Sequence, residues 1–475
     1  MSTSGAVAAV DLGATSGRVI LGRVADGVLQ TQHISRFSND PVRTRDGLHW
    51  NLLELYRQTL AGLALAERGA PGEIASIGID SWAVDYGLFR EGRLLGSPFH
   101  YRDERTEAGV AAVAARVATT ELYARNGLQQ IPINTVYQLA TEEPILGFAD
   151  RMLLIPDLLN FWLTGAEHAE RTNASTTGLL DPRAREWDLT LADTLGMPRR
   201  IFPTLIDPGT RVGALTPEVA AIVGRPLDVL AVASHDTASA VAAIPTTRTD
   251  FAYISCGTWG LVGLELDAPV LTDAARLAGF TNEGGIGGTT RFLRNVMGLW
   301  MLSESLRHWE PAASDAQRSS QLSELLAAAA RVDGPIPIFD VDDPAFMPPG
   351  DIPGRIATWF AERGERGPEG PAAIVRSIIE SLAEAFAVAV RTSAELAGRD
   401  VGTIHIVGGG SLNTLLCQAL ATRSGLTVLA GPVEATAIGN MLVQAQTLGQ
   451  LGPDLADLRA VVARSSEVVT YLPVR

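Results

Sequence analysis

The segment Ser234-His235-Asp236-Thr237 holds the residues best suited to proton transfer. It places a histidine, one of seven in the chain, beside a carboxylate, and it follows the apolar residues 229–233, which predict a strand. Ligands of open α/β sheets bind at the carboxyl ends of strands, where Asp236 could accept a proton from a hydroxyl group that attacks phosphorus. The alternative is structural: Asp236 caps the following helix, and His235 is a hydrogen-bonded residue of the fold.

A glycine-rich turn near the amino terminus has the composition of a phosphate-binding loop. Apolar residues 7–10 and 19–21 predict two strands of a hairpin. The turn between them reads Asp11-Leu12-Gly13-Ala14-Thr15-Ser16-Gly17-Arg18. Its backbone N–H groups can approach phosphate oxygens closely, Arg18 would add a permanent positive charge, and Asp11 could hold Mg²⁺ through water. An ordinary hairpin with an ion-paired arginine is the alternative.

A second turn of the same kind lies about half a chain further on. Residues 251–255 and 261–263 predict another hairpin, with Gly257 and Thr258 at its turn, and Gly257 follows Gly13 by 244 residues. Two hairpins that face each other could grip a polyphosphate from both sides. The recurrence therefore favours the phosphate-binding interpretation of both turns.

Another pair of segments repeats in the same order. Predicted strands at residues 229–233 and 426–430 each run into a helix of small residues, with Asp236 or Glu434 in its first turn. Acids at these positions also complement the helix dipole, which is their structural explanation. Because two different motifs recur in the same order, the sequence predicts a duplicated architecture.

Three consecutive glycines, Gly408, Gly409 and Gly410, follow the apolar residues 404–407. A strand that opens into glycines and then a helix lets a phosphate or a flat group approach the backbone closely. The spacing differs from the dinucleotide fingerprint G-x-G-x-x-G. A nucleoside resting on this segment and close packing of the strand against the helix are both open interpretations.

The elements that must position these residues alternate along the chain. Helical periodicity at residues 52–68 precedes a strand at 74–79, and a long helix at 372–397 precedes the strand at 404–407. This alternation predicts α/β units. A polar stretch at residues 245–250 indicates a boundary between domains 1–246 and 247–475.

Composition excludes several classes of mechanism. The chain has 475 residues and no lysine, so all 38 basic residues are arginine, and lysine-dependent P-loop, protein-kinase and pyridoxal-phosphate sites are excluded. The net charge of −15 argues against nucleic acid or a membrane surface as a partner. Two cysteines suit a reducing compartment, and the amino terminus lacks a signal peptide's basic segment. Neither the G-x-S-x-G elbow of serine hydrolases nor a zinc-ligand spacing is present.

Together the motifs resemble the FGGY family of carbohydrate kinases over nearly the whole chain. The matching segments are TNASTTGLLD from Thr172, ASHDTASAVAAIP from Ala233, ISCGTWGLVG from Ile254, NVMGLW from Asn295 and IHIVGGGSLN from Ile404. The resemblance implies an α/β fold of two duplicated actin/hexokinase-type (ribonuclease H-like) ATPase domains around a central cleft. It also implies a cytoplasmic monomer or homodimer that acts on small molecules rather than on nucleic acid or a membrane.

The activity that the resemblance implies is ATP-dependent transfer of the γ-phosphoryl group to O1 of a ketose, with Mg²⁺ and with L-rhamnulose as the expected sugar. By position, Asp236 would be the general base and Asp11 would lie beside the metal. The implied contacts to ATP are Asp11, Gly13, Ala14, Thr15, Ser16, Gly17, Arg18, Gly257, Thr258, Ser303, Gly408, Gly409 and Gly410. The implied contacts to the sugar are Ala83, His235, Asp236, Thr237 and Asn295.

Two positions depart from the family pattern. The family favours glycine where this chain has Ala83, at a place where the backbone meets the substrate; crowding of a sugar carbon by the added methyl group and no effect are both open. Ser303 stands where the family has glutamine near ATP, and the resemblance implies one contact lengthened into a water bridge. Three alternatives stay open: a different ketose such as fuculose, xylulose or ribulose; an actin-like ATPase that acts as a scaffold; and a sugar-binding regulator without catalysis.

Overall fold

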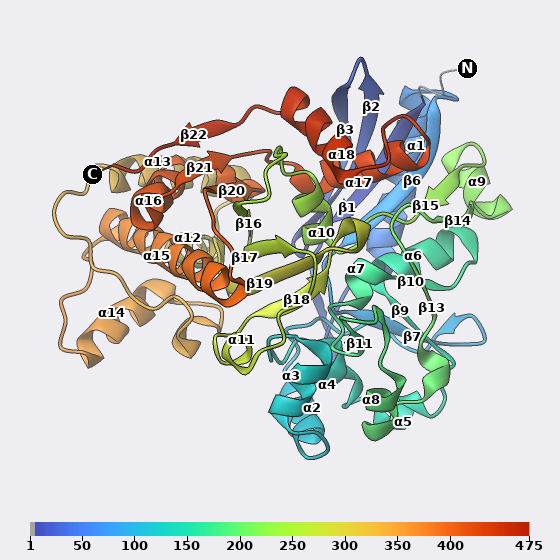
Figure 1. Ribbon diagram of the computed structural model, residues 1–475, viewed down its shortest axis with the longest axis horizontal. Coiled ribbons are helices and arrows are strands. Elements are labelled where there is room, and N and C mark those ends of the chain that lie inside the picture. The colour runs from blue at the N-terminus through green and yellow to red at the C-terminus, as the bar shows by residue number, and fades with distance from the viewer. Residues whose placement is uncertain (1–4, 475) are drawn as a thin grey trace. The chain divides into compact units, whose positions relative to one another are not determined.

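The computed structural model describes residues 5–474 and divides into two compact units (Figure 1). Unit 1 comprises Met1–Thr247, Glu265–Phe292 and Glu434–Ser466. Unit 2 comprises Arg248–Leu264, Leu293–Val433 and Glu467–Arg475. The boundary between residues 246 and 247 and the central cleft stay predictions. The expectation that the amino terminus is not a signal peptide rests partly on residues 1–4, which lie outside the described residues.

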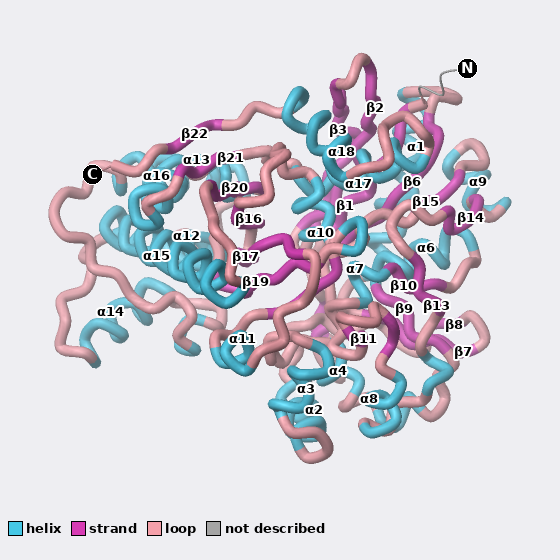
Figure 2. The backbone as a smooth tube through the Cα atoms, in the orientation of Figure 1, coloured by secondary structure: helices cyan, strands magenta, loops and turns pink. Residues whose placement is uncertain are grey.

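A six-stranded mixed sheet is the framework of unit 1, in the order β14-β15-β6-β1-β2-β3 (Figure 2). Its strands are β1 (Ala6–Leu12), β2 (Ser16–Ala25), β3 (Val28–Ser38), β6 (Ile74–Ser81), β14 (Arg211–Ala214) and β15 (Asp228–Leu230). β1, β2 and β3 are antiparallel, β6 is parallel to β1, and β15 is parallel to β6. The first predicted hairpin is therefore confirmed.

Helices cover both faces of this sheet, which is why every residue of β1 is buried. The methyl groups of Val19 on β2 lie against Gly62 of α1 (Leu52–Gly69), whereas Gly22 on the same strand lies against Met441 of α17 (Ala435–Thr447). Residues 19 and 22 point to opposite faces because side chains alternate along a strand. α1 and α17 thus sandwich the sheet.

The short helix α10 (Asp236–Ala242), which carries Asp236, packs against α17. The approach is very close: a Cβ atom on Gly439 of α17 would lie 1.9 Å from the carbonyl oxygen of Ser239. Only glycine allows this backbone contact. The position of the first residue of α10 is therefore set by a buried helix that lies some 200 residues further along the chain.

A second large sheet, to which most strands of unit 2 belong, repeats the arrangement with seven strands in the order β18-β19-β17-β16-β20-β21-β22. Its strands are β16 (Phe251–Cys256), β17 (Trp259–Leu266), β18 (Thr281–Gly284), β19 (Thr290–Met297), β20 (Thr403–Val407), β21 (Thr427–Ala430) and β22 (Val469–Tyr471). β16 is antiparallel to β17 and parallel to β20, β20 is parallel to β21, and β22 closes the edge antiparallel. The same hairpin, parallel neighbours and antiparallel edge strand occur in unit 1, so the predicted duplication of α/β architecture is confirmed.

Unit 2 also contains five α-helices among its described residues. They are α12 (Trp300–Trp309), α13 (Asp315–Ala329), α14 (Ile352–Glu362), α15 (Pro371–Ala397) and α16 (Thr414–Ser424). α15 confirms the predicted long helix: Pro371 occupies its first turn, and Gly398 ends it in the left-handed region with φ of 60°. α15 and α16 lie side by side (Figure 1).

The remaining part of unit 1 contains a second hydrophobic core under short elements. Its strands are β4 (Val42–Arg43), β5 (Leu48–His49), β7 (Tyr86–Arg90), β8 (Arg93–Leu94), β9 (Arg151–Leu154), β10 (His168–Glu170), β11 (Leu180–Asp181), β12 (Glu186–Trp187) and β13 (Thr204–Ile206). Its helices are α2 (Thr106–Ala114), α3 (Thr119–Asn126), α4 (Thr135–Leu139), α5 (Glu143–Leu146), α6 (Ile155–Thr164), α7 (Arg171–Ala174), α8 (Leu189–Thr194), α9 (Pro217–Val223), α11 (Asp273–Leu277) and α18 (Leu455–Ser465).

Two details of the expected elements were wrong. The strand expected at residues 229–233 ends at Leu230, because the backbone beyond it turns away to pair with other loops. Glu434 is the residue before α17 rather than part of its first turn, and its side chain makes no capping hydrogen bond, since it pairs with Arg18 instead. Within residues 5–474, none of the helices combines the length and the apolarity needed to cross a membrane.

Candidate active site

Two buried carboxyl groups lie side by side at the carboxyl ends of β1 and β6. Asp11 and Asp80 are register partners in the parallel pair of these strands, and both are almost fully buried. Burial raises the pKa of Asp80 well above its ordinary value, and the neighbouring Asp11 raises it further. Burial also raises the pKa of Asp11, although Arg18 acts to lower it. The strand ends thus concentrate negative charge in a place with little water.

Arg18 is the counter-ion of Asp11. Its Nε donates to Oδ2 of Asp11 at 2.9 Å, its Nη2 lies 2.8 Å from the same oxygen, and its Nη1 lies 2.9 Å from Oε2 of Glu434. The arginine side chain is 24% exposed. Arg18 therefore neutralises two carboxylates from different parts of the chain while one edge of its guanidinium stays accessible.

The two aspartates have the chemistry of a divalent-cation site. Both contacts of Arg18 go to one oxygen of Asp11, and Oδ2 of Asp80 accepts from Nδ2 of Asn440 at 2.5 Å. Oδ1 of Asp80 is buried and has no hydrogen-bond partner among the described residues. Mg²⁺ typically takes one or two carboxylates plus water and phosphate oxygens, so this unsatisfied oxygen beside Asp11 fits such an ion. The described residues hold no cluster of three or more ligating side chains.

The turn between β1 and β2 is shaped to present backbone groups. The N–H of Gly13 donates to the carbonyl of Ser16 at 2.9 Å, which makes the turn tight. Asn39 holds it from outside, since its Nδ2 donates to the carbonyl of Gly13 at 2.9 Å. Gly17 is buried against Phe37, where a Cβ atom would lie 2.3 Å from the ring. Of the predicted contacts, Thr15 is exposed, and Ala14 and Ser16 are partly exposed beside it.

The loop that carries Asp236 is joined to β6 and to α7. The N–H of Ser81 donates to the carbonyl of Ser234 at 2.9 Å. The buried carboxylate of Glu170 accepts from both the N–H and the hydroxyl of Ser234, at 2.9 and 2.8 Å, and also from the N–H of Thr172. Glu170, which sequence reasoning missed, therefore fixes the backbone just before His235.

The two oxygens of Asp236 have different surroundings. Oδ1 accepts from the N–H of Thr237 at 2.5 Å and from its hydroxyl at 3.1 Å, and it lies 3.4 Å from Nε2 of His235. Oδ2 accepts no hydrogen bond from any described residue, and the side chain is 30% exposed. One oxygen is thus held in place while the other is available to a ligand.

Ala83 lies in the loop between β6 and β7, next to a strained residue. Val84 has a φ of 66°, a conformation that is a clear outlier for a β-branched residue. Its carbonyl accepts from the hydroxyl of Thr135 at 2.6 Å, and its N–H donates to Oγ1 of Thr176 at 3.3 Å, so two buried side chains hold it there. The strain fixes the direction of the partly buried Ala83, where the sequence indicates a substrate contact.

An aromatic cluster with one buried acid supports this loop. Asp85 accepts from the indole N–H groups of Trp50 and Trp82 at 2.5 and 3.0 Å and from the backbone of Tyr101 at 3.2 Å. Burial raises the pKa of Asp85 to about 7 in spite of these donors. The ring of His100 stacks on Trp50 with centroids 4.1 Å apart.

His100 should make stability depend on pH. Burial, together with the positive charge of Arg102, lowers the pKa of His100 from 6.5 to about 4. As the pH falls from 6.5 to about 4, His100 binds a proton in the unfolded chain but not in the folded chain. The folded protein therefore loses stability across this pH range. Between pH 7 and 4.5 we expect the free energy of unfolding to drop by about 2–3 kcal/mol more for the wild type than for His100→Gln.

Urea unfolding at several pH values measures this difference. His33→Gln is the matched control, because His33 is exposed on β3, and its pH dependence should follow that of the wild type. Parallel curves for the wild type and His100→Gln would contradict the assignment.

The second hairpin turn, in unit 2, is tighter than the first. The N–H of Gly257 donates to the carbonyl of Trp259 at 2.9 Å, and the carbonyl of Gly257 accepts from Leu299 just before α12. Gly257 is exposed and Thr258 is partly exposed. Ser303 lies in the first turns of α12, and its hydroxyl donates to the carbonyl of Leu299 at 3.3 Å. The turn and the start of α12 therefore form one local structure.

The three glycines occupy the turn after β20. A Cβ atom on Gly410 would lie 2.3 Å from the sulfur of Cys256, and one on Gly408 would lie 3.0 Å from the Cys256 carbonyl. Gly409 is exposed, with no atom within 4 Å of a Cβ position. Gly408 and Gly410 thus serve close packing, whereas only Gly409 offers open backbone. Asn295 is partly exposed on β19.

Unit 1 therefore brings together four residues that the sequence indicated, Asp11, Arg18, His235 and Asp236. Five further charged residues contact them or the loops that carry them: Asp80, Glu170, Glu283, Arg291 and Glu434. Unit 2 brings Gly257, Thr258 and Ser303 together at the start of α12. That both groups face one ligand stays a prediction. Asp80 and Glu434 carried a signal, as acids next to predicted strands, but Arg291 and Glu283 resembled ordinary strand residues.

The chain belongs to the FGGY family of carbohydrate kinases. The family's N-terminal domain matches residues 6–243, and its C-terminal domain matches residues 252–448. The enzyme is accordingly a phosphotransferase with a sugar acceptor.

Similar proteins agree with this class. Two rhamnulokinases are each 39% identical to it over 472 residues: one from Bacteroides thetaiotaomicron, with 98% of this chain and 95% of the relative covered, and one from Enterococcus faecalis, with 98% and 93% covered. Among solved structures, a xylulose kinase from Rhodospirillum rubrum superposes with a TM-score of 0.78 at 19% identity, covering 98% of this chain and 94% of the other. A gluconate kinase from Lactobacillus acidophilus gives 0.77 at 16% identity, covering 98% and 93%. These structures share the two-domain actin/hexokinase-type fold.

Proposed function

We propose that this kinase transfers the γ-phosphoryl group of ATP to O1 of L-rhamnulose, giving L-rhamnulose 1-phosphate and ADP. The observation that carries the proposal is the arrangement of Asp236. Its Oδ1 accepts from Thr237, whereas its Oδ2 accepts from no described residue, and the side chain is partly exposed. The full-length similarity to rhamnulokinases supports this sugar over other ketoses.

Asp236 is the general base in this proposal. Its Oδ2 accepts the proton of the O1 hydroxyl as that oxygen forms a bond to the γ-phosphorus and the bond to the β-phosphate oxygen breaks. His235, Thr237, Asn295 and Ala83 line the sugar. Because such transition states are loose and spread charge over phosphate oxygens, positioning and electrostatic stabilisation contribute more than proton transfer does.

The triphosphate lies against the glycine turns. In the first turn, backbone N–H groups at Ala14, Thr15 and Ser16 meet the phosphates together with Arg18, while Gly13 and Gly17 shape the turn. Thr258 and Ser303 serve the second turn, which Gly257 shapes. Gly409 lies beside the nucleoside, and Gly408 and Gly410 pack the segment that carries it. Asp11, with Asp80 next to it, would hold Mg²⁺ through water. When bound, the ion would neutralise charge on the phosphates.

A cytoplasmic location and a monomeric or homodimeric state belong to the same proposal. The two buried free cysteines, Cys256 and Cys417, suit a reducing compartment. Burial raises the pKa of both thiols to about 12, which keeps them unreactive.

A panel of ketoses tests the substrate. The purified enzyme is incubated with Mg-ATP and L-rhamnulose, L-fuculose, D-xylulose, D-ribulose or no sugar; ADP release is followed and the products are identified by mass. We expect the highest kcat/KM and a sugar monophosphate with L-rhamnulose. A different preferred ketose would replace the proposed sugar, and ATP hydrolysis that is indifferent to sugar would favour a scaffold ATPase instead.

A further inference from the structure

The histidine beside the proposed base is part of a buried charged cluster. Arg291 on β19, with 0% exposure, donates from Nη2 to Nδ1 of His235 at 2.9 Å. The same Nη2 lies 2.9 Å from Oε2 of Glu283 on β18, and this oxygen lies 3.3 Å from Nδ1 of His235. Among the described residues, the groups that face the imidazole from the surrounding elements are Arg291, Glu283 and Asp236. The hydroxyl of Thr172 contacts the backbone instead, where it accepts from the N–H of His235 at 3.3 Å.

The hydrogen bond from Arg291 decides which nitrogen of His235 carries the proton. A guanidinium has only donors and keeps its charge at any ordinary pH, so the nitrogen that it contacts must be an acceptor. Nδ1 is therefore unprotonated, and the single proton of the neutral ring is on Nε2. Nε2 is the nitrogen that lies 3.4 Å from Oδ1 of Asp236.

Glu283 makes a buried arginine tolerable at this position. An unpaired charge in the interior is strongly destabilising, whereas a close ion pair offsets much of the desolvation cost. Although burial by itself acts to raise the pKa of Glu283, that pKa is lowered, chiefly by the positive charge of Arg291, so the acid stays ionised. The ion pair of Arg291 and Glu283 carries no net charge.

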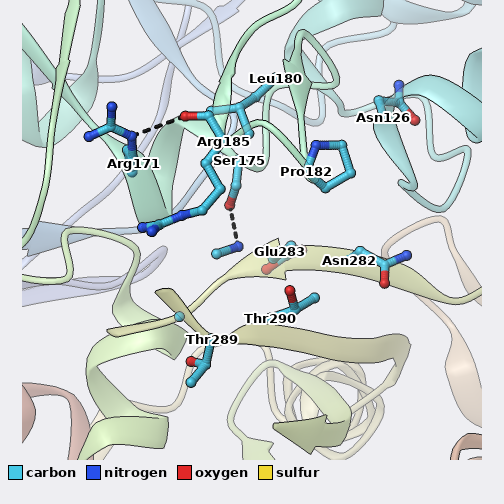
Figure 3. A pocket seen from close by; sticks show the side chains of 12 residues that line it. Asn126, Arg171, Ser175, Leu180, Pro182, Arg185, Asn282, Glu283, Thr289 and Thr290 are labelled. Atoms are coloured by element: carbon cyan, nitrogen blue, oxygen red, sulfur yellow. Dashed lines mark hydrogen bonds between the residues drawn. The ribbon is translucent and has the colours of Figure 1, made fainter. Parts of the chain in front are cut away.

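The backbone around Glu283 is held from both sides. The N–H of Gly284 donates to Oγ of Ser175 at 2.7 Å, and the carbonyl of Gly284 accepts from Nε of Arg291 at 2.9 Å. Figure 3 shows the small pocket beside these residues, with Ser175 and Glu283 in its wall. Its volume of about 20 Å³ has room for little more than one water molecule. The cluster is therefore built to hold side chains in place, not to bind a second ligand.

We propose that Arg291 and Glu283 are positioning residues of the phosphoryl transfer, which hold His235 as the Nε2–H tautomer so that its proton faces Oδ1 of Asp236 and leaves Oδ2 free for the sugar hydroxyl. This inference rests on Asp236 being the base of the proposed function. Without Arg291, Nδ1 could carry the proton and donate to Glu283, and Nε2 would then turn a lone pair toward the carboxylate. Repulsion between the lone pair and the carboxylate would displace Asp236.

The tautomer can be measured without any substrate. Nitrogen-15 spectra of the wild-type protein labelled at its seven histidines distinguish protonated from unprotonated ring nitrogens, and His235→Gln assigns the signals. We expect a protonated Nε2 and an unprotonated Nδ1 on His235 at pH 7.5. A protonated Nδ1 would overturn the proposal, whether or not L-rhamnulose proves to be the substrate.

Kinetics test whether Arg291 acts through His235. We expect Arg291→Met to lower kcat about 10–100-fold, as loss of an outer orienting partner does at other sites, with little change in the KM for the ketose. In the His235→Gln background, where the amide nitrogen is a donor whatever Arg291 does, the same change should cost less than about threefold. An equal loss in both backgrounds would show a merely structural role and overturn the proposal.

Arg459→Met is the matched control. Arg459 is likewise buried and paired with a glutamate, Glu265, at 2.7 Å, and it donates to the carbonyl of Val241 on α10 without contacting His235. It should lower thermal stability about as much as Arg291→Met does while changing kcat less than about twofold. A comparable loss of kcat in the control would attribute the effect to α10 packing and contradict the role of Arg291.

Discussion

Asp236→Asn should lower kcat about 10²–10⁴-fold and leave the fold and ketose binding intact. The amide has the same shape, and its oxygen can still accept from the N–H and the hydroxyl of Thr237 in the place of Oδ1. Its nitrogen then occupies the place of Oδ2 and cannot accept a proton. The residual activity should come from positioning of the two substrates, which the substitution does not remove.

The measurement combines turnover, binding and stability. ADP release gives kcat, equilibrium titration gives the dissociation constant for the ketose, and thermal unfolding reports the fold. Asp193→Asn is the matched control, since Asp193 is an exposed partner of Arg199, and it should change none of the three. Near-normal turnover of Asp236→Asn would remove Asp236 as the base and with it the mechanism proposed above.

Arg18→Ala should lower kcat/KM for ATP about 10²–10³-fold, the loss seen when one electrostatic donor is removed from an active site. Two effects add. A positive charge next to the phosphates is lost. The buried carboxylate of Asp11, to which Arg18 is bound at 2.8–2.9 Å, is then left to repel the phosphates. The dissociation constant for the ketose should change only a few-fold, because Arg18 lies at the phosphate turn.

Glu434 provides a sharper version of this test. In the structure described here, Nη1 of Arg18 is paired with Glu434 rather than free, so ATP must compete for it. Glu434→Gln weakens that competition without removing Arg18, and the KM for ATP should stay the same or fall. Thermal unfolding of both variants separates loss of stability from loss of binding. Unchanged ATP kinetics in Arg18→Ala would contradict a role of Arg18 in phosphate binding.

Local patterns were enough to predict the framework of the fold. The hairpin turns at Gly13 and Gly257 were recognisable because glycine and small polar residues interrupt apolar runs, and the long helix α15 because its apolar positions repeat at helical spacing between Pro371 and Gly398. The repeated order of hairpin and parallel strands confirmed the duplication. Strand ends were less predictable, as at Leu230, beyond which the backbone pairs with loop residues instead of with β6.

The site was predictable only where chemistry and local pattern coincide. His235 and Asp236 stand out because they end an apolar run together. Arg291 and Glu283 were missed, although a charged residue directly before Phe292 and Leu293 was a weak signal of a buried ion pair. Asp80 directly follows the predicted strand at residues 74–79, but its pairing with Asp11 depends on the register of β1 against β6.

The sequence by itself determined the two hairpin turns, the α/β repeat and the acid–base pair, because each is encoded within a few neighbouring residues. Only the tertiary structure decided the state of those groups: which oxygen of Asp236 is free, which nitrogen of His235 is a donor, and that Asp11 and Glu434 share one arginine. The physical reason is that protonation and orientation depend on desolvation and on charges within a few ångströms. Here those charges come from residues as distant in sequence as Arg18 and Glu434.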